Sequence, residues 1–203
     1  MSEYLKAFLS ALAQVSRLSD IEAFRSLAPL IAAVPNDRRP PPSSGCATSN
    51  MCLEDAVRAI PPHLELADAG KAAARVSPWA EASRGIPEFF SGGYAYSILV
   101  DENPPSGPDP IRAGLLLQQP DIAYPGHAHD AEEFYFVLSG EAHWRVGSDE
   151  FSALPGALIH HPPAAVHAMQ TKAQPLLAAW VWRGDLTGRF WYESAPDVDC
   201  PRS

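Results

Sequence analysis

The sequence predicts a mainly β fold, in which a small C-terminal barrel follows a helical N-terminal extension. Over the first 80 positions, apolar residues recur at three- and four-residue spacings, as they do on one face of a helix. After about Gly92 the chain changes to short apolar and aromatic runs bounded by Gly, Pro, Asp or Ser, which is typical of a β-sandwich or barrel. We therefore expect residues 1–90 to form the extension and residues 91–203 the barrel.

The extension is predicted from helical periodicity and its interruptions. One apolar face runs from Leu5 to Leu27, in one helix or in two consecutive helices, and weaker periodicity returns at Leu53–Ile60 and Leu64–Val76. A proline-rich linker near residues 35–45 separates these parts because proline lacks an amide donor and clashes with the preceding turn. An apolar helix face must pack on something, so we expect the helices to cover the outer face of the sheet and to help form a homodimer.

The barrel is predicted from nine short runs of branched and aromatic residues. The one long loop among these runs is Glu102–Pro110, which contains four prolines. The predicted strands are Tyr94–Val100, Ile111–Leu117, Glu132–Leu138, Ala142–Val146, Glu150–Ala153, Ala157–His160, Val166–Thr171, Leu176–Trp182 and Arg189–Tyr192.

Composition and charge exclude several classes of function. The 203 residues carry 24 acids and 15 bases, a net charge of -9, and no basic cluster stands out, which argues against nucleic acid as a partner. No apolar run approaches the roughly 20 residues of a membrane helix, and no secretory signal is recognisable at the amino terminus. Cys46, Cys52 and Cys200 form no CxxC pair, which favours free thiols. We expect a protein of the cytoplasm that has no membrane partner.

The candidate functional residues are concentrated between Tyr124 and Gly140. Because side chains alternate along a strand, His127 and His129 share one face, and Glu133 and Tyr135 share one face of the next strand. If both faces turn inward, imidazole, carboxylate and phenol groups converge in the barrel. Such a cluster needs compensation there, and imidazole nitrogens with a carboxylate oxygen suit a divalent metal.

A third imidazole is expected from a later strand. His167 follows the turn at Pro155 and Gly156 and is the first choice, with His160 or His161 as substitutes. The pattern His127-x-His129-x3-Glu133-x6-Gly140, followed by Pro155-Gly156 and His167, resembles the two motifs of the cupin superfamily. The resemblance implies a cupin-type double-stranded β-helix barrel, which holds one metal in its mouth.

A narrower resemblance concerns residues 124–135, the helical extension and the chain length. Together they resemble bacterial dimethylsulfoniopropionate (DMSP) lyases of the DddQ type, which cleave that sulfonium zwitterion into dimethyl sulfide and acrylate. The resemblance implies a metal bound by His129, Glu133 and His167, with Tyr135 able to enter the metal shell. It makes His127 a group of the substrate pocket, whereas the matching residue of most cupins is a metal ligand, and both roles stay open. The ion would be Fe, Mn, Ni, Co or Zn, all of which suit nitrogen and oxygen ligands.

The implied β-elimination needs a base within about 3 Å of a carbon-bound proton, and a metal acting as Lewis acid on the substrate carboxylate. Tyr135 is the first candidate base and Tyr124 the second, because a nearby cation lowers the pKa of a phenol. The sulfonium would be held over aromatic faces, for which Trp180, Trp182 and Tyr192 are available. We expect one of the two tryptophans to face the barrel and the other the outer layer, and the family likeness favours Trp182 as the substrate contact.

A second hypothesis is another kind of metal cupin. An iron dioxygenase would consume oxygen with its substrate, whereas a non-catalytic small-molecule sensor would bind a ligand without turnover. A sensor should also carry a DNA-binding helix-turn-helix, and the proline-separated, acidic N-terminal helices argue against one.

Overall fold

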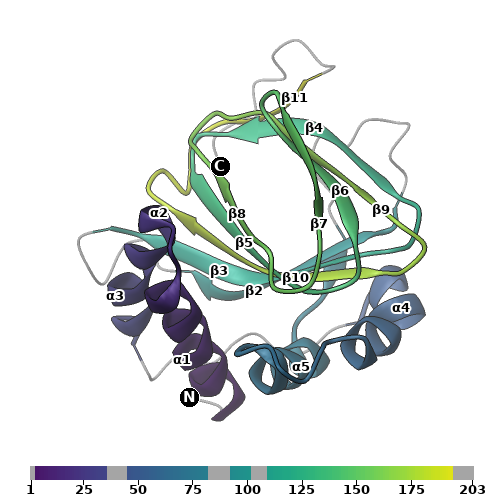
Figure 1. The fold of residues 1–203 in the computed structure, drawn as a ribbon, viewed down its shortest axis with the longest axis horizontal. Coiled ribbons are helices and arrows are strands. Elements are labelled where there is room, and N and C mark those ends of the chain that lie inside the picture. The colour runs from purple at the N-terminus through teal and green to yellow at the C-terminus, as the bar shows by residue number, and fades with distance from the viewer. Residues whose placement is uncertain (1–2, 36–44, 82–91, 102–108, 194–203) are drawn as a thin grey trace.

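The structure, a computed structural model, describes residues 3–35, 45–81, 92–101 and 109–193 (Figure 1). Helices occupy the N-terminal part of the described chain, and strands follow from Ala80 onwards. The helices are α1 (Glu3–Leu18), α2 (Glu22–Arg25), α3 (Leu27–Ala32), α4 (Ala47–Arg58) and α5 (Ala67–Val76). The strands are β1 (Ala80–Glu81), β2 (Tyr94–Asp101), β3 (Ile111–Gln118), β4 (Ala123–His129), β5 (Glu132–Ser139), β6 (Ala142–Val146), β7 (Asp149–Ala153), β8 (Leu158–His161), β9 (His167–Thr171), β10 (Leu176–Arg183) and β11 (Phe190–Tyr192).

The strands form two antiparallel sheets that face each other. One sheet has the order β1-β2-β3-β10-β5-β8, and the other has the order β11-β4-β9-β6-β7. Viewed as in Figure 1, the two sheets curve around a common interior. From β3 onwards, consecutive strands fall in different sheets, except for the hairpin β6–β7. This is the pattern of the double-stranded β-helix of a cupin, and the predicted fold class is confirmed.

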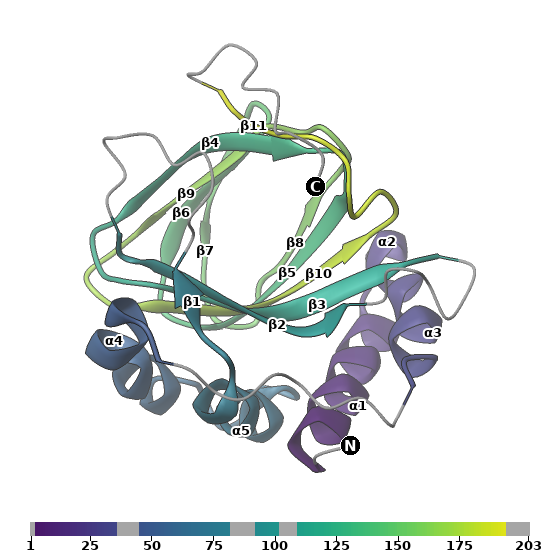
Figure 2. The ribbon, with the colours of Figure 1, turned by 180° about the vertical axis from the view of Figure 1, so that it is seen from behind.

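The six-stranded sheet is buried on both faces, and its strands alternate between two cores. On β5, the side chains of Phe134, Phe136 and Leu138 pack with the helices, whereas Tyr135 and Val137 face the barrel interior. Figure 2 shows α1, α4 and α5 lying against the outer side of this sheet. Helix α2 also contributes, because Phe24 makes edge-to-face contacts with Phe134 and Phe136 at ring-centroid distances of 5.1 Å each. The predicted cover of the outer sheet by the helices is therefore confirmed.

The predicted helical face from Leu5 to Leu27 is divided between three helices. The division begins at Ser19, whose hydroxyl accepts a hydrogen bond from the amide of Ile21 at 3.1 Å. A local bond of this kind competes with the helical hydrogen bond, and Ile21 is extended. The chain therefore turns after α1, so that α3 packs beside α1.

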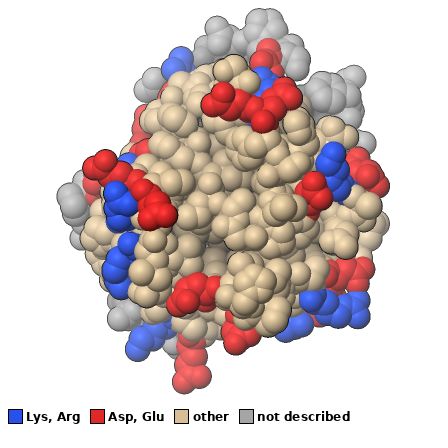
Figure 3. All heavy atoms as spheres, in the orientation of Figure 1, with Lys and Arg blue, Asp and Glu red and all other residues tan. Residues whose placement is uncertain are grey.

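Some predictions concern residues outside the described part. These are most of the proline-rich linker (36–44), the boundary near residue 90, most of the Glu102–Pro110 loop, and Cys200. Among the described helices, none is long and apolar enough to span a membrane. On the face drawn in Figure 3, Lys and Arg side chains lie near the edge, beside Asp and Glu, rather than as one continuous basic surface.

Candidate metal centre

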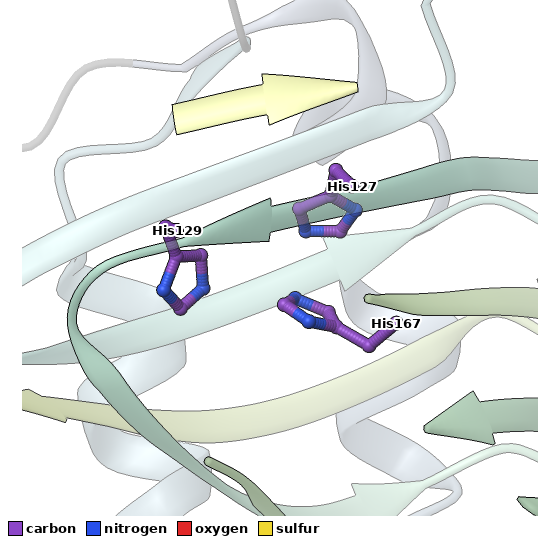
Figure 4. A group of neighbouring side chains, drawn as sticks. All are labelled: His127, His129 and His167. Atoms are coloured by element: carbon purple, nitrogen blue, oxygen red, sulfur yellow. The ribbon is translucent and has the colours of Figure 1, made fainter. Parts of the chain in front are cut away.

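Four strands bring a cluster of imidazoles and one carboxylate together inside the barrel. β4 carries His127 and His129, β5 carries Glu133, β8 carries His161 and β9 carries His167. His127 and His167 are directly opposite across the β4–β9 pair, and their ring centroids lie 4.1 Å apart. All five side chains are at least 95 % buried. Figure 4 shows the rings of His127, His129 and His167 turned towards a shared space.

A β-bulge places Tyr124 on the same wall as His127. Tyr124 pairs with Met169 and His127 pairs with His167, so Pro125 and Gly126 together lie opposite one residue of β9. In a regular strand, residues three positions apart would point to opposite faces, and the extra residue cancels that difference. The Tyr124 ring consequently lies 4.6 Å from the His127 ring.

Three of the imidazoles are held by backbone carbonyls of their own strands or turns. Nδ1 of His127, His129 and His167 lies 2.9 Å from the carbonyl oxygen of Pro125, Ala131 and Ala165, respectively. Because a carbonyl oxygen only accepts, each Nδ1 carries the proton of this bond, and each neutral ring keeps a lone pair on Nε2. Backbone contacts of this kind fix the orientation and tautomer of metal-binding histidines.

Two of these Nε2 lone pairs, those of His129 and His167, are directed towards the Glu133 carboxylate. Its Oε2 lies 3.2 Å from Nε2 of His129 and 3.3 Å from Nε2 of His167. Nε2 of His167 is buried without a hydrogen bond among the described residues. Potential ligand atoms of His127, His129 and His167 all lie within 4.8 Å of one another, and so do those of Glu133, His161 and His167. Converging lone pairs around a buried carboxylate fit a divalent cation.

His161 lies in the cluster, whereas His160 does not. Nδ1 of His161 lies 2.9 Å from Oε2 of Glu133, and its Nε2 lies 2.9 Å from Nε1 of Trp144. His160 points to the opposite face of β8, where its Nε2 lies 2.7 Å from Oε1 of Glu132. Of the two residues considered as substitutes for His167, only His161 reaches the cluster, and it adds to His167 rather than replacing it.

Burial and charge shift the pKa values of the cluster in opposite directions. Burial alone would raise the pKa of Glu133, but the charge of His129 and the hydrogen bond from His161 help to hold it well below its usual value. Burial would lower the pKa of His129, but the Glu133 carboxylate raises it. Burial, then the charge of His167, lowers the pKa of His127 well below its usual value and that of His161 to about 4. Burial thus favours the neutral forms of His127 and His161, whereas Glu133 favours the charged form of His129.

The two candidate bases are buried phenols beside the cluster. Tyr135 is 3 % exposed and lies on the same face of β5 as Glu133, two residues further along the strand. Burial, followed by the charge of Glu133, raises the pKa of Tyr135 well above its usual value. Burial and the neighbouring phenols Tyr94 and Tyr192 do the same for Tyr124. Each needs a nearby positive charge before it can act as a base.

Trp182 and Trp180 both face the barrel interior, so the expectation that they face opposite layers is wrong. Residues two positions apart on a strand share a face, and the two rings lie 6.0 Å apart. The indole nitrogen of Trp182 donates to Oε1 of Glu133 at 2.6 Å, and its ring packs on His129 with a centroid distance of 4.3 Å. Tyr192 lies 6.2 Å from His127 between ring centroids.

Some residues of the site were not singled out from the sequence. Tyr94 lies 4.5 Å from Tyr124 and Phe190 lies 5.3 Å from His127 between ring centroids. Trp144 reaches the cluster through His161. The alternation of β6, with Ala142 and Trp144 both fully buried, was the available signal for Trp144. The contacts of Tyr94 and Phe190 depend on strand pairing across the barrel, for which a single sequence has no local signal.

The fold and this cluster define a cupin-type barrel with a candidate metal centre. A family model for dimethylsulfoniopropionate lyase matches residues 51–178, and the chain belongs to that family. The chain is 29 % identical over 192 residues to the dimethylsulfoniopropionate lyase DddQ of Ruegeria pomeroyi, an alignment that covers 91 % of this chain and 92 % of the relative.

Two solved structures of DMSP lyases share the whole fold. One, from a study of RdDddP and RnDddQII, has a TM-score of 0.70 at 24 % identity and covers 94 % of this chain and 98 % of its own. The DddQ structure from Ruegeria pomeroyi DSS-3 has a TM-score of 0.64 at 27 % identity, with coverage of 93 % and 96 %. The predicted family, and with it a carbon–sulfur lyase acting on DMSP, is confirmed.

Proposed function

We propose that the chain cleaves DMSP by a metal-dependent β-elimination in which a tyrosine is the base. The observation that carries the proposal is the convergence of the Nε2 lone pairs of His129 and His167 on the buried Glu133 carboxylate, with a potential ligand atom of His127 within 4.8 Å of theirs, in a chain of the DMSP lyase family. The residues that would hold one divalent ion are His127, His129, Glu133 and His167. Tyr135, two residues from Glu133 on the same face of β5, is the further group that would join them. When bound, the ion supplies a Lewis acid for the substrate carboxylate and a positive charge that lowers the pKa of a neighbouring phenol.

Tyr135 is the proposed base. It takes the proton from the carbon next to the substrate carboxylate, a double bond forms to the neighbouring carbon, and the carbon–sulfur bond breaks. Sulfur keeps the bonding electron pair, so the products are dimethyl sulfide, acrylate and one proton held by the phenol. Because the thioether leaves neutral, no acid is needed at the leaving group. The burial of Tyr135 keeps bulk water away from this proton transfer.

The substrate-binding wall is proposed to consist of Tyr124, His127 and Trp182. The bulge turns Tyr124 inward beside His127, where an aromatic face can hold the sulfonium by a cation–π contact of roughly 0.5–2 kcal/mol. Trp182 reaches the site with its indole nitrogen engaged by Glu133, so it would offer the substrate only the ring. Within the described part of the chain His127 makes a hydrogen bond only through Nδ1, so its Nε2 can serve as a metal ligand or as a pocket group.

The test is release of dimethyl sulfide from DMSP by the purified chain. We expect headspace dimethyl sulfide with the metal-loaded protein, loss of activity on chelation, and recovery when Fe²⁺, Mn²⁺, Ni²⁺, Co²⁺ or Zn²⁺ is returned. Tyr135→Phe should lower kcat by at least about 100-fold, as expected when a general base is removed. Tyr4→Phe, a phenol on α1, is the matched control and should leave activity unchanged.

Two results would contradict the proposal. No dimethyl sulfide above background, together with oxygen uptake or ligand binding without turnover, would favour a dioxygenase or a sensor. Full activity of Tyr135→Phe with loss in Tyr124→Phe would move the role of base to Tyr124.

We also propose the domain boundary near residue 90, a homodimer and a cytoplasmic location. Light scattering of the purified chain tests the homodimer.

A further inference from the structure

Glu133 is contacted from both neighbouring strands, at one level of the six-stranded sheet. Trp182 on β10 and His161 on β8 are the direct register partners of Glu133 on β5. Trp182 donates to Oε1 at 2.6 Å, and Nδ1 of His161 lies 2.9 Å from Oε2. These two side chains, one on each side of β5, therefore determine where the carboxylate lies.

The partner of His161 fixes its tautomer. The indole nitrogen of Trp144 is only a donor, and it lies 2.9 Å from Nε2 of His161. Nε2 must accept this bond, so the proton of the neutral ring is on Nδ1 and is donated to Oε2 of Glu133. Both ring nitrogens are then occupied, which leaves His161 no lone pair for an ion.

Burial makes this arrangement rigid. His161 and Trp144 have 0 % exposure, so water does not compete for either hydrogen bond. The rings of His161 and His167 are stacked with centroids 3.8 Å apart, and Tyr135 lies 5.4 Å from His161. The free lone pairs of Oε2 are consequently left facing Nε2 of His129 and Nε2 of His167.

We infer that His161, with its tautomer set by Trp144, is a positioning residue that orients Glu133 for metal binding and is not itself a metal ligand. The inference rests on the proposed metal centre. It assigns different roles to the two histidines that lie with Glu133 in one potential metal-binding group. His167 keeps its Nε2 lone pair, whereas the Nε2 lone pair of His161 accepts the hydrogen bond from Trp144.

The experiment measures Co²⁺ affinity of the full chain by competition with a chelator, and records the visible absorption of the Co²⁺-loaded protein. His161→Leu removes the donor and should raise the dissociation constant about 10–100-fold, as expected for a residue that orients a ligand. His161→Asn keeps an N–H group near the position of Nδ1 and should restore affinity to within about threefold, with an absorption spectrum like that of the wild type. Trp144→Phe, which frees the tautomer, should give an intermediate loss.

His160→Leu is the matched control, because it removes a histidine–glutamate contact one residue away on the opposite face of β8. It should bind Co²⁺ as the wild type does. Wild-type affinity in His161→Leu, or no recovery in His161→Asn, overturns the inference while the metal centre stands. If His161→Leu does not fold, Trp144→Phe and His161→Asn carry the test, and wild-type affinity in Trp144→Phe overturns the role of Trp144. A wild-type chain that binds no Co²⁺ overturns the proposed metal centre itself.

Discussion

Nε2 of His129 and Oε2 of Glu133 lie 3.2 Å apart, although neither atom carries a proton when the imidazole is neutral and Glu133 is ionised. Nδ1 of His129 carries the proton of a neutral ring, because it donates to the carbonyl of Ala131. Two lone pairs at this distance repel unless a proton or a metal ion lies between them. The Glu133 carboxylate raises the pKa of His129, which favours a second proton on the ring, at Nε2, between the two atoms. Metal binding should therefore displace a proton.

Glu133→Gln should abolish metal binding. The amide carries no charge, and its N–H groups would donate to the Nε2 lone pairs and close the site. We expect the metal dissociation constant to rise by at least about 100-fold, more than for a residue that only orients a ligand, with a parallel loss of activity. Metal analysis after dialysis checks the result. Glu132→Gln is the control, because Glu132 pairs with Arg183 and His160 on the other face of β5; equal metal content in the two variants would contradict the assignment.

Trp182→Phe should destabilise the metal-free protein. The phenyl ring retains most of the packing on His129, but Oε1 of Glu133 loses a buried donor. A hydrogen bond to a charged group contributes about 1.5–3 kcal/mol, so the free energy of unfolding in urea should fall by that amount. Trp180→Phe makes the same change on the same strand face without a bond to Glu133. A similar loss in both variants would show that packing alone explains the effect.

Gly140→Ala should cost more stability than Gly147→Ala. Both glycines have positive φ angles, of 80° and 59°, so alanine adds backbone strain of about 1–2 kcal/mol at each. A Cβ at residue 140 would also lie 2.3 Å from the carbonyl oxygen of Pro175, whereas at residue 147 it would meet nothing within 4 Å. Urea unfolding of both variants checks the difference, and equal losses would mean that the contact with Pro175 relaxes freely.

Cys52 should be almost unreactive in the folded protein. Burial, followed by the charge of Asp55, raises the pKa of its thiol to about 11. At pH 8 only about one thiol in a thousand is then ionised, and the thiolate is the reactive form. Because pH 8 to 10 lies below this pKa, the alkylation rate of Cys52 should rise about tenfold per pH unit. Mass spectrometry of iodoacetamide-treated peptides checks this, and fast labelling at pH 8 without urea would contradict the raised pKa.

The barrel was largely predictable because its strands are short apolar runs between turn residues. Ala142–Val146 was predicted with the same bounds as β6, and Glu132–Leu138 is one residue shorter than β5. β4 was missing from the predicted strands because Pro125 and Gly126 are typical of a turn, whereas here they form a bulge within the strand. Local composition cannot distinguish these two uses of the same pair of residues.

The part of the candidate site that depends on the alternation of side chains along one strand was predictable. The inward faces of His127 with His129, and of Glu133 with Tyr135, follow from a period of two along each strand. The contact of His161 with Glu133 depends on the register between β5 and β8, which are 28 residues apart at this point. Such a register is set by the packing of the whole sheet, so His161 could be suspected from the sequence but not placed.

The bulge in β4 also determines, by one additional residue, which side chains of this strand face the barrel interior. Gly126 fits there because a Cβ would lie 2.3 Å from the Glu193 carboxylate, which pairs with Arg145 above the strand. Deleting this one glycine would restore strict alternation, and Tyr124 would swap sides with its neighbour Ala123. The phenol of Tyr124 would then leave the barrel interior, although none of the proposed metal ligands had been substituted. Deletion of one residue in this strand would therefore change the composition of the site.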